Sequence, residues 1–266
     1  MRCGGTIFAE GRELYRRRLE TMRSSGKIRP MRLLAFDSST NWLSVACGAD
    51  GAWCVRGEPA GQAHSERLLP LVDAVLAESG WSLRSLDGIA FGAGPGSFTG
   101  VRIACGVAQG LGLGADLPLV PVPTLEALAQ AAWREHAATH VATLVVACLD
   151  ARMREVYVAA YAREDGRWNE VFAPAVLPPS EVAMHFGGGP AWLGVGGGFA
   201  AYPALSALLA LRQVDADAVP DARAIGELAQ PRLAAGGGVA AADALPLYVR
   251  HRVALTAAEL ATGARL

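Results

Sequence analysis

A pattern of strand, aspartate, turn and strand occurs twice in the sequence, and this repetition limits the fold more than any other feature. In the first copy, an apolar run ends in Asp37, and a second run after a short turn leads to Asp50-Gly51. In the second copy, an apolar run ends in Asp150, and an alternating strand leads to another turn with Asp-Gly. Asp-Gly is a strong signal for a tight β-hairpin turn. The copies at 32–51 and 143–166 indicate a degenerate internal duplication, with a chance match as the alternative.

The composition suits a folded protein of one large or two small domains. Of the 266 residues, 52% are hydrophobic and 18% charged, which allows a core and excludes wholesale disorder. No run of about 18 apolar residues occurs, so no transmembrane helix is expected. The net charge of −1 gives no general attraction to nucleic acid or to an anionic membrane. The five cysteines form no CxxC pair, which argues against a zinc site or disulfide framework and favours a reduced, cytoplasmic protein.

Charge and proline positions divide the chain into an extension and two lobes. Residues 1–30 carry eight basic and three acidic side chains, a balance of +5 that leaves −6 for the rest. Few large apolar residues occur there, so we predict a disordered N-terminal extension before a natural start at Met31. Prolines between 118 and 123 predict an extended passage from an N-terminal lobe at 31–118 to a C-terminal lobe at 119–266 with a loose tail. The only lysine, Lys27, lies in the extension, which excludes a catalytic or phosphate-binding lysine in either lobe.

Helical periodicity recurs between the predicted strands. Apolar residues at helical spacing predict a helix that Gly80 ends, and another helix begins with Thr124 as its expected N-cap. The predicted helices span 65–79, 99–114, 124–137, 203–212 and 221–235.

The segment Gly92–Arg102, with the sequence GAGPGSFTGVR, is the most distinctive part of the chain. Glycines allow backbone N–H groups to converge, and the following helix N-terminus adds partial positive charge, so the loop is a candidate phosphate cradle. It matches neither the Walker A pattern nor G-x-G-x-x-G. A tight turn without a ligand is the alternative for the loop, and an aspartate that caps its own turn is the alternative for the strand-end carboxylate. The candidate nucleotide-binding residues are Asp37, Gly94, Gly96, Ser97 and Thr99.

Small residues recur at four-residue spacing along the helix at 99–114. Each interior glycine costs about 1 kcal/mol relative to alanine in a helix, so a compensating close contact is expected. Small residues at this spacing form a ridge that lets another backbone approach closely. Either the sheet of the same chain or a second protein chain is expected to pack there. The two ridges are Gly100, Ala104, Ala108 and Gly112, and Gly106, Gly110 and Gly114.

No cluster of residues in the sequence predicts catalysis or a metal site. His64 is followed four positions later by Leu68, where a helical metal site needs its second ligand. His136 and His140 are four apart but straddle the expected end of a helix. A G-x-S-x-G nucleophile motif is absent from the sequence. We therefore predict no catalytic residue and no metal site.

Several segments together resemble the TsaB (YeaZ) family of bacterial proteins. They are DSST at 37–40, HSERLLPLV at 64–72, GPGSFTGVRIACGVAQGLGLG at 94–114, TLEALAQ at 124–130 and DARMREVY at 150–157, with LPLYVR at 245–250 similar to the C-terminal signature. The resemblance covers about 31–252. It implies the two-lobed α/β fold of actin, Hsp70 and sugar kinases (ASKHA), with an internal duplication and mixed sheets flanked by helices.

The resemblance also implies a function in tRNA modification. A protein of this family is a required, non-catalytic subunit for threonylcarbamoyl transfer to N6 of adenosine in tRNAs that read codons beginning with A. The implied partners are the catalytic paralogue TsaD and the ATPase TsaE, with tRNA reached indirectly through the complex. A homodimer is the implied alternative when TsaD is absent. No cofactor is implied for the isolated chain, whereas the complex allows ATP or ADP.

The family pairs with TsaD through the first two helices of the N-terminal lobe. TsaD-like proteins carry a His-x-x-x-His metal motif on the first of these helices, and only His64 matches it here, which supports a scaffold. The alternative is an active small-molecule kinase or ATPase of the same fold, with Asp37 as a metal–phosphate ligand. The partner-binding residues that the resemblance implies are Leu68, Val72, Leu76, Gly100, Ala104, Ala108 and Gly112.

Overall fold

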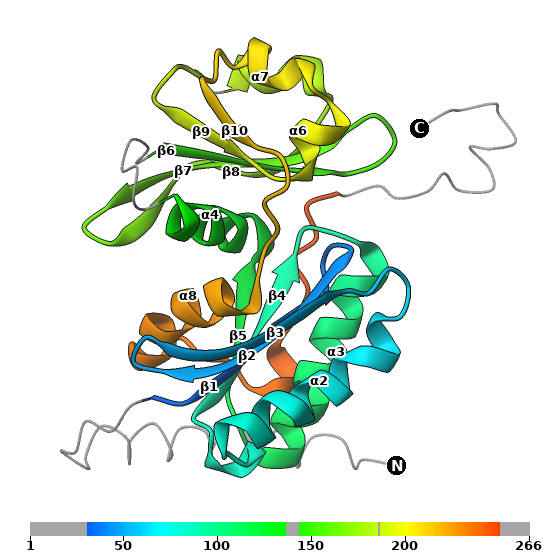
Figure 1. Cartoon of the computed structure of the whole chain (residues 1–266), viewed down its shortest axis with the longest axis vertical. Coiled ribbons are helices and arrows are strands. Elements are labelled where there is room, and N and C mark those ends of the chain that lie inside the picture. The colour runs from blue at the N-terminus through cyan, green and yellow to red at the C-terminus, as the bar shows by residue number, and fades with distance from the viewer. Residues whose placement is uncertain (1–30, 137–143, 186, 251–266) are drawn as a thin grey trace, which may run out of the picture.

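The computed structural model describes residues 31–136, 144–185 and 187–250, which form two α/β lobes stacked along the long axis of the molecule (Figure 1). The strands of the first lobe are β1 (Leu33–Asp37), β2 (Trp42–Ala49), β3 (Ala52–Pro59), β4 (Gly88–Gly94) and β5 (Leu119–Pro123). The strands of the second lobe are β6 (Leu144–Asp150), β7 (Val156–Glu164), β8 (Arg167–Leu177), β9 (Trp192–Val195) and β10 (Gln213–Asp215).

Helices cover both sheets. They are α2 (His64–Ser79), α3 (Phe98–Ala115), α4 (Thr124–Glu135), α5 (Val182–His185), α6 (Gly197–Ala201), α7 (Ala204–Leu208) and α8 (Ala222–Ala234). Short 3-10 turns lie at η1 (Leu83–Ser85), η2 (Pro179–Glu181) and η3 (Ala241–Asp243). Within the described ranges, no helix combines the length and apolar character that crossing a membrane requires.

The first sheet has the order β3-β2-β1-β4-β5, and helices bury both of its faces. The first three strands are antiparallel neighbours, whereas β4 runs parallel to β1 and β5. Side chains of β1 alternate between the faces. Leu34 and Phe36 pack in the core formed with α2 and α3, and Leu33 and Ala35 pack in the core formed with α8. Burial on both sides explains why this strand is a continuous apolar run.

The second sheet repeats the topology of the first. Its order is β10-β9-β6-β7-β8, so the meander β6-β7-β8 corresponds to β1-β2-β3, and β9 and β10 correspond to β4 and β5. Both hairpins turn through Asp-Gly with positive φ, at Asp50 (47°) and Gly51 (83°), and at Asp165 (49°) and Gly166 (75°). These are the type I′ turns that match the twist of the flanking strands. The predicted internal duplication is therefore confirmed in the topology.

The lobes differ from the predicted division between residues 118 and 119. β5 follows that boundary in sequence but pairs with β4 in the first sheet. α8 also belongs to the first lobe, because Ile225 and Leu233 lie in the same core as Leu33. α4 lies between the sheets, with Ala127 in a core of the first lobe and Leu128 in a core of the second (Figure 1). The chain thus enters the second lobe through α4 and returns through α8.

Two helix boundaries show how tertiary contacts select among local signals. Gly80 ends α2 in the left-handed conformation, with φ of 66°, as predicted. The prediction of Thr124 as N-cap of α4 is wrong, because Pro123 takes that position. The Thr124 hydroxyl instead accepts a hydrogen bond from the Gly94 N–H at 3.1 Å and so ties α4 to the end of β4.

The C-terminal half departs from the prediction at one helix. The helix expected at 203–212 is shorter, because α7 ends at Leu208 and the chain continues into β10. The helix expected at 221–235 is confirmed as α8. The predicted extension at 1–30 and the residues expected to be loose after 256 lie outside the described residues.

Candidate docking face and interlobe cleft

One small-residue ridge of α3 packs against the sheet of its own lobe. Gly100, Ala104, Ala108 and Gly112 are all buried, and both alanines have no exposed surface. A Cβ on Gly112 would lie 2.7 Å from Leu119 Cδ2 of β5. The structure therefore contradicts the prediction that these four residues bind a partner, because the chain's own sheet already covers them.

The residues predicted on α2 are buried in the same way. Leu68, Val72 and Leu76 are at most 8% exposed and lie in the core shared with α3 and the first sheet. The structure thus contradicts their predicted contact with a partner as well. Apolar periodicity identifies the side of a helix that faces a core, and here that core belongs to the chain itself.

The second ridge of α3 faces away from the lobe. A Cβ built on Gly106, Gly110 or Gly114 would meet no described atom within 4 Å. Leu113 lies on the same side and is 67% exposed, and Leu69 of the adjacent α2 is 46% exposed. Figure 1 shows α2 and α3 side by side on one face of the first sheet. We call these five residues the outer face.

Close packing within the first lobe explains the glycines of the segment Gly92–Arg102. The turn after β1 rests directly on this segment, and the Ser38 hydroxyl donates a hydrogen bond to the Gly100 carbonyl oxygen at 2.8 Å. A Cβ would overlap Asp37 Oδ1 at Gly92 and the Ser38 carbonyl oxygen at Gly100, and would lie 2.5 Å from the Ser39 carbonyl oxygen at Gly96. The glycines at four-residue spacing therefore fit three successive residues of that turn.

Backbone donors of the same loop are also engaged within the chain. The Ser97 N–H donates to the Ser39 carbonyl oxygen at 2.7 Å. The Gly94 N–H donates to Thr124, and the Gly100 N–H donates to the Ser97 hydroxyl at 3.4 Å. A phosphate cradle requires N–H groups that point at the ligand, and these three point at the protein. Nucleotide binding by this loop stays a prediction.

Asp37 lies beneath the loop and is completely buried. Its Oδ2 accepts hydrogen bonds from the Ser39 N–H at 3.2 Å and the Ser39 hydroxyl at 2.8 Å, whereas Oδ1 has no hydrogen-bond partner among the described residues. Burial raises the pKa of this carboxyl to about 7, with a smaller upward contribution from Asp221, although the bonds from Ser39 act in the opposite direction. The geometry matches an aspartate that caps its own turn.

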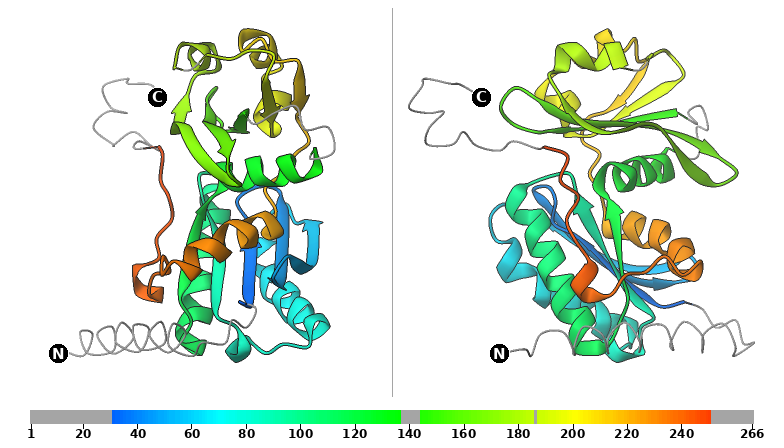
Figure 2. Two further views of the ribbon diagram at one scale, coloured as in Figure 1. Left: turned by 90° about the vertical axis from the view of Figure 1, so that its left-hand side faces the viewer. Right: turned by 180° about the vertical axis from the view of Figure 1, so that it is seen from behind.

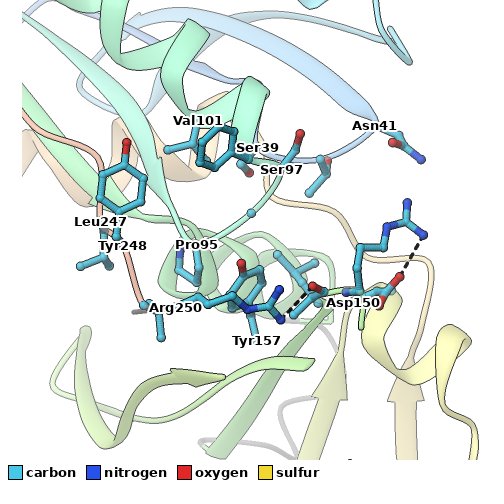
Figure 3. A pocket seen from close by; sticks show the side chains of 18 of the residues that line it. Ser39, Asn41, Pro95, Ser97, Val101, Asp150, Tyr157, Leu247, Tyr248 and Arg250 are labelled. Carbon is cyan, nitrogen blue, oxygen red and sulfur yellow. Dashed lines mark hydrogen bonds and ion pairs between the residues drawn. The ribbon is translucent and has the colours of Figure 1, made fainter. Parts of the chain in front are cut away.

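A cleft of about 890 Å³ separates the two lobes (Figure 3). Of the five predicted nucleotide-binding residues, Gly96 and Ser97 line it, whereas Asp37, Gly94 and Thr99 do not. The cleft is lined by the turn at 39–41, the start of α3, residues 149–152 with Tyr157, Gly197 with Ala201, and the C-terminal segment 247–250.

A stacked group at the mouth of the cleft was not predicted. The Arg102 guanidinium carbon lies 3.2 Å from the centre of the Phe98 ring and 4.9 Å from that of Tyr248. Both rings are more than half exposed. Phe98 and Arg102 are four apart in one helix, a spacing that brings side chains together and was available from the sequence. Tyr248 joins them through tertiary structure, which no local pattern indicates.

The described residues offer no group of three or more metal-ligating side chains. His64 is 5% exposed, and its Nε2 lies 2.9 Å from the Thr40 carbonyl oxygen, to which an N–H on this nitrogen donates. The histidine thus fastens the start of α2 to the turn after β1. Asp150, the second strand-end aspartate, borders the cleft and pairs with Arg152 at 3.2 Å.

Two solved structures from Pseudomonas aeruginosa share this architecture. One is described as an uncharacterized protein with similarity to peptidase YEAZ. It has a TM-score of 0.75 and 40% identity, and the match covers 83% of this chain and all of that one. The other, YeaZ, has a TM-score of 0.74 and 40% identity over 82% of this chain and 99% of that one. The duplicated topology and the interlobe cleft define a two-lobed α/β protein, and the two YeaZ structures share this fold.

Sequence comparisons narrow this class to a family. The family described as TsaD: tRNA N6-adenosine threonylcarbamoyltransferase matches residues 55–258. The tRNA threonylcarbamoyladenosine biosynthesis protein TsaB of Escherichia coli is 42% identical over 229 residues, 84% of this chain and 96% of that protein. TsaB of Haemophilus influenzae is 40% identical over 83% of this chain and 94% of that protein. The chain therefore belongs to the TsaB family.

Proposed function

We propose that the chain is a non-catalytic subunit for the transfer of threonylcarbamoyl to N6 of adenosine in tRNAs that read codons beginning with A. It acts by binding the catalytic paralogue TsaD through the outer face and holding TsaD in an active form. The names of the relatives support the process, since both are tRNA threonylcarbamoyladenosine biosynthesis proteins. The observation that carries the docking proposal is the row of outward-facing glycines on α3.

These glycines weaken α3 without a benefit inside the described chain. Gly106 and Gly110 lie in the helix interior, where each costs about 1 kcal/mol relative to alanine. A Cβ at either position would meet no described atom within 4 Å, so no intramolecular contact requires glycine. A helix of another protein that approaches closely would require it, because the absence of Cβ lets two backbones come together. The exposed side chains of Leu69 and Leu113 offer apolar area beside the glycines.

The surroundings of Asp37 support a role without catalysis. Its carboxyl is buried below the loop, outside the lining of the cleft, and its raised pKa keeps much of it protonated near neutral pH. A metal–phosphate ligand needs the ionised carboxylate at the cleft surface. The backbone N–H groups of Gly94 and Ser97 also support a role without catalysis, because both donate hydrogen bonds within the chain.

The proposal extends to the other members of the complex. TsaE joins the pair, and tRNA reaches this chain only through the complex. The net charge of −1 of this chain fits such indirect contact, because direct binding of the tRNA backbone depends on basic side chains. ATP or ADP belongs to the complex, and the isolated chain takes no cofactor. A second copy can occupy the outer face when TsaD is absent. Four described cysteines are free thiols, which supports a cytoplasmic location.

Reconstitution tests this function directly. Purified TsaD and TsaE, with TsaC, the family's enzyme that makes the activated threonylcarbamoyl donor, are assayed for threonylcarbamoylation of tRNA with and without this chain. Transfer is expected only when the chain is present. The Gly106→Leu/Gly110→Leu variant is expected to abolish transfer while its circular dichroism stays that of the wild type. Ala207→Leu, on the exposed side of α7 in the second lobe, is the matched control and is expected to keep full activity. Equal rates with and without the chain would contradict the proposal.

The runner-up function is an ATP-binding kinase or ATPase of the same fold. The cleft favours it, because Ser97, Arg102 and Arg152 line a volume of about 890 Å³ that is large enough for a nucleotide. Calorimetry of the isolated chain with ATP and Mg²⁺ separates the two functions. Micromolar binding would favour the kinase, and the absence of heat would favour the subunit.

A further inference from the structure

The segment 244–250 connects the two lobes along the open side of the cleft, and we call it the strap. It rises from η3 beside the first lobe and reaches the second lobe, as Figure 2 shows from behind. Elsewhere the described chain passes between the lobes at the start of α4 and again before α8. Those two passages lie beside α4 and α8. Among the described connections between the lobes, the strap is therefore the one at the cleft.

Side chains and backbone of the first lobe hold the beginning of the strap. The Ala244 carbonyl oxygen accepts hydrogen bonds from Gln109 Nε2 at 2.9 Å and from the Cys105 thiol at 3.5 Å, both on α3. The Leu247 N–H donates to the Ala93 carbonyl oxygen at the end of β4, at 2.7 Å. A Cβ on Gly94 would lie 2.9 Å from the Leu247 carbonyl oxygen, so the glycine leaves room for the strap.

Arg250 fastens the other end of the strap to the second lobe. Its guanidinium donates to the Ala151 carbonyl oxygen at 3.1 Å and forms an ion pair with Glu155. A further contact joins Nη1 to Met153 Sδ at 3.1 Å. The Arg250 side chain is only 11% exposed, so this is a largely buried charge, and these hydrogen-bond and ion-pair partners lie in the turn between β6 and β7.

The turn that Arg250 holds has an unusual backbone. Three successive residues, Arg152, Met153 and Arg154, have positive φ of 62°, 52° and 61°. Residues other than glycine seldom adopt this conformation, and such strain persists only where surrounding contacts fix it. Backbone hydrogen bonds close this turn, from the Ala151 N–H to the Glu155 carbonyl oxygen at 3.0 Å and from the Glu155 N–H to the Arg152 carbonyl oxygen at 2.9 Å. The contacts of Arg250 with Ala151 and with Glu155 lie on either side of the three residues and add to that constraint.

We propose that the strap is an interlobe latch and that Arg250 sets the width of the cleft by fixing the second lobe to the first. Figure 3 shows Leu247, Tyr248 and Arg250 following one another along one wall of the cleft. Two-lobed proteins commonly close around a ligand by hinge motion. Here the chain's own segment spans the opening, so the cleft keeps its width without a ligand.

Distance measurement between the lobes tests the latch. Spin labels on unnatural amino acids at Asp73 of α2 and Met184 of α5, both exposed, report the separation in the full chain. In Arg250→Ala the distance distribution is expected to be about twice as wide as in the wild type, because hinge motion is released. Arg56→Ala is the matched control, since Arg56 pairs with Glu78 at 2.9 Å within the first lobe and its loss leaves the distribution unchanged.

A milder variant keeps the test decisive. Glu155→Gln removes the charge of the partner but keeps the hydrogen bond from Arg250 to Ala151, so a smaller widening is expected. If Arg250→Ala fails to fold, Glu155→Gln alone decides the question. Distributions that coincide with the wild type in every folded variant would overturn the latch.

Discussion

Replacement of Gly106 and Gly110 by alanine separates stability from binding. In the isolated chain a methyl group at either position meets no described atom within 4 Å, so only helix propensity changes. Each substitution is expected to raise the free energy of unfolding by about 1 kcal/mol, and the pair by about 2 kcal/mol. For a chain of this size, the melting temperature of the double variant should rise by about 4–8 °C.

The same double variant is expected to bind TsaD more weakly. Two methyl groups would hold the partner backbone away from α3, and a loss of about 1.4 kcal/mol corresponds to a tenfold higher Kd. Urea unfolding measures the stability of the isolated chain, and titration calorimetry with TsaD measures the affinity. Higher stability of the isolated chain together with weaker binding of TsaD would indicate that the glycines serve the contact with a partner.

Gly112 supplies the matched control in the same helix. A Cβ there would lie 2.7 Å from Leu119 Cδ2 and 3.2 Å from the Leu117 carbonyl oxygen, so Gly112→Ala should destabilise the lobe through overpacking. The reasoning would be refuted if Gly106→Ala/Gly110→Ala lowered the stability of the isolated chain. Unchanged affinity for TsaD would refute it equally.

Three further predictions concern the interior of the first lobe. The carboxyl pKa of Asp37 is raised from 3.8 to about 7, so its contribution to stability is complete below pH 3.8, falls as the pH rises and is lost above pH 7. Relative to Asp37→Asn, the wild type should lose up to about 4 kcal/mol across that window in unfolding titrations, and parallel pH profiles would disprove the shift. Gly100→Ala should lower the melting temperature sharply, because its Cβ would overlap the Ser38 carbonyl oxygen, whereas an unchanged value would show that the turn can move. Ala104→Leu should cost about 1–3 kcal/mol through overpacking of a fully buried site, and full stability with selective loss of TsaD binding would instead restore the inner ridge as an interface.

Patterns that depend on neighbours in sequence were predictable. The apolar period gave α2 with its end at Gly80, and the Asp-Gly pairs gave the hairpin turns of both lobes. The repeated strand and aspartate pattern indicated the duplication that the two sheets display. Each of these patterns is formed by residues close together in the sequence. Local backbone geometry, such as the helical period or a two-residue turn, therefore determines the structure that the pattern adopts.

Features that depend on which surface faces a core were not predictable in the same way. Both ridges of α3 have four-residue spacing, and spacing alone does not say which one meets the sheet. A usable signal was present, since the charged Arg102 precedes Gly106 by four positions and so lies on the same side of the helix as the outer ridge. The lobe boundary failed because α8 returns to the first sheet, a contact between distant parts of the chain.

Prediction of the candidate cleft from the sequence was limited for the same reason. The loop around Gly96 was singled out correctly as distinctive, but its glycines fit the turn after β1 and three of its donors serve the chain. The carboxylate of Asp37 lies behind the loop and not in the cleft. Glycines in a sequence pattern indicate that the backbone there approaches another group closely. Only the fold identifies that group, which can be a ligand or another part of the same chain.

Hydrogen–deuterium exchange of this chain with and without TsaD measures most directly whether the outer face is the docking surface. Binding raises the free energy of local opening where the partner sits, and amides there exchange more slowly. Slower exchange is expected in the peptides that cover 64–79 and 98–115. In the peptides that cover β8, the exchange rate is expected to stay the same with and without TsaD. Slowing confined to the second lobe, or no slowing in α3, would contradict the account.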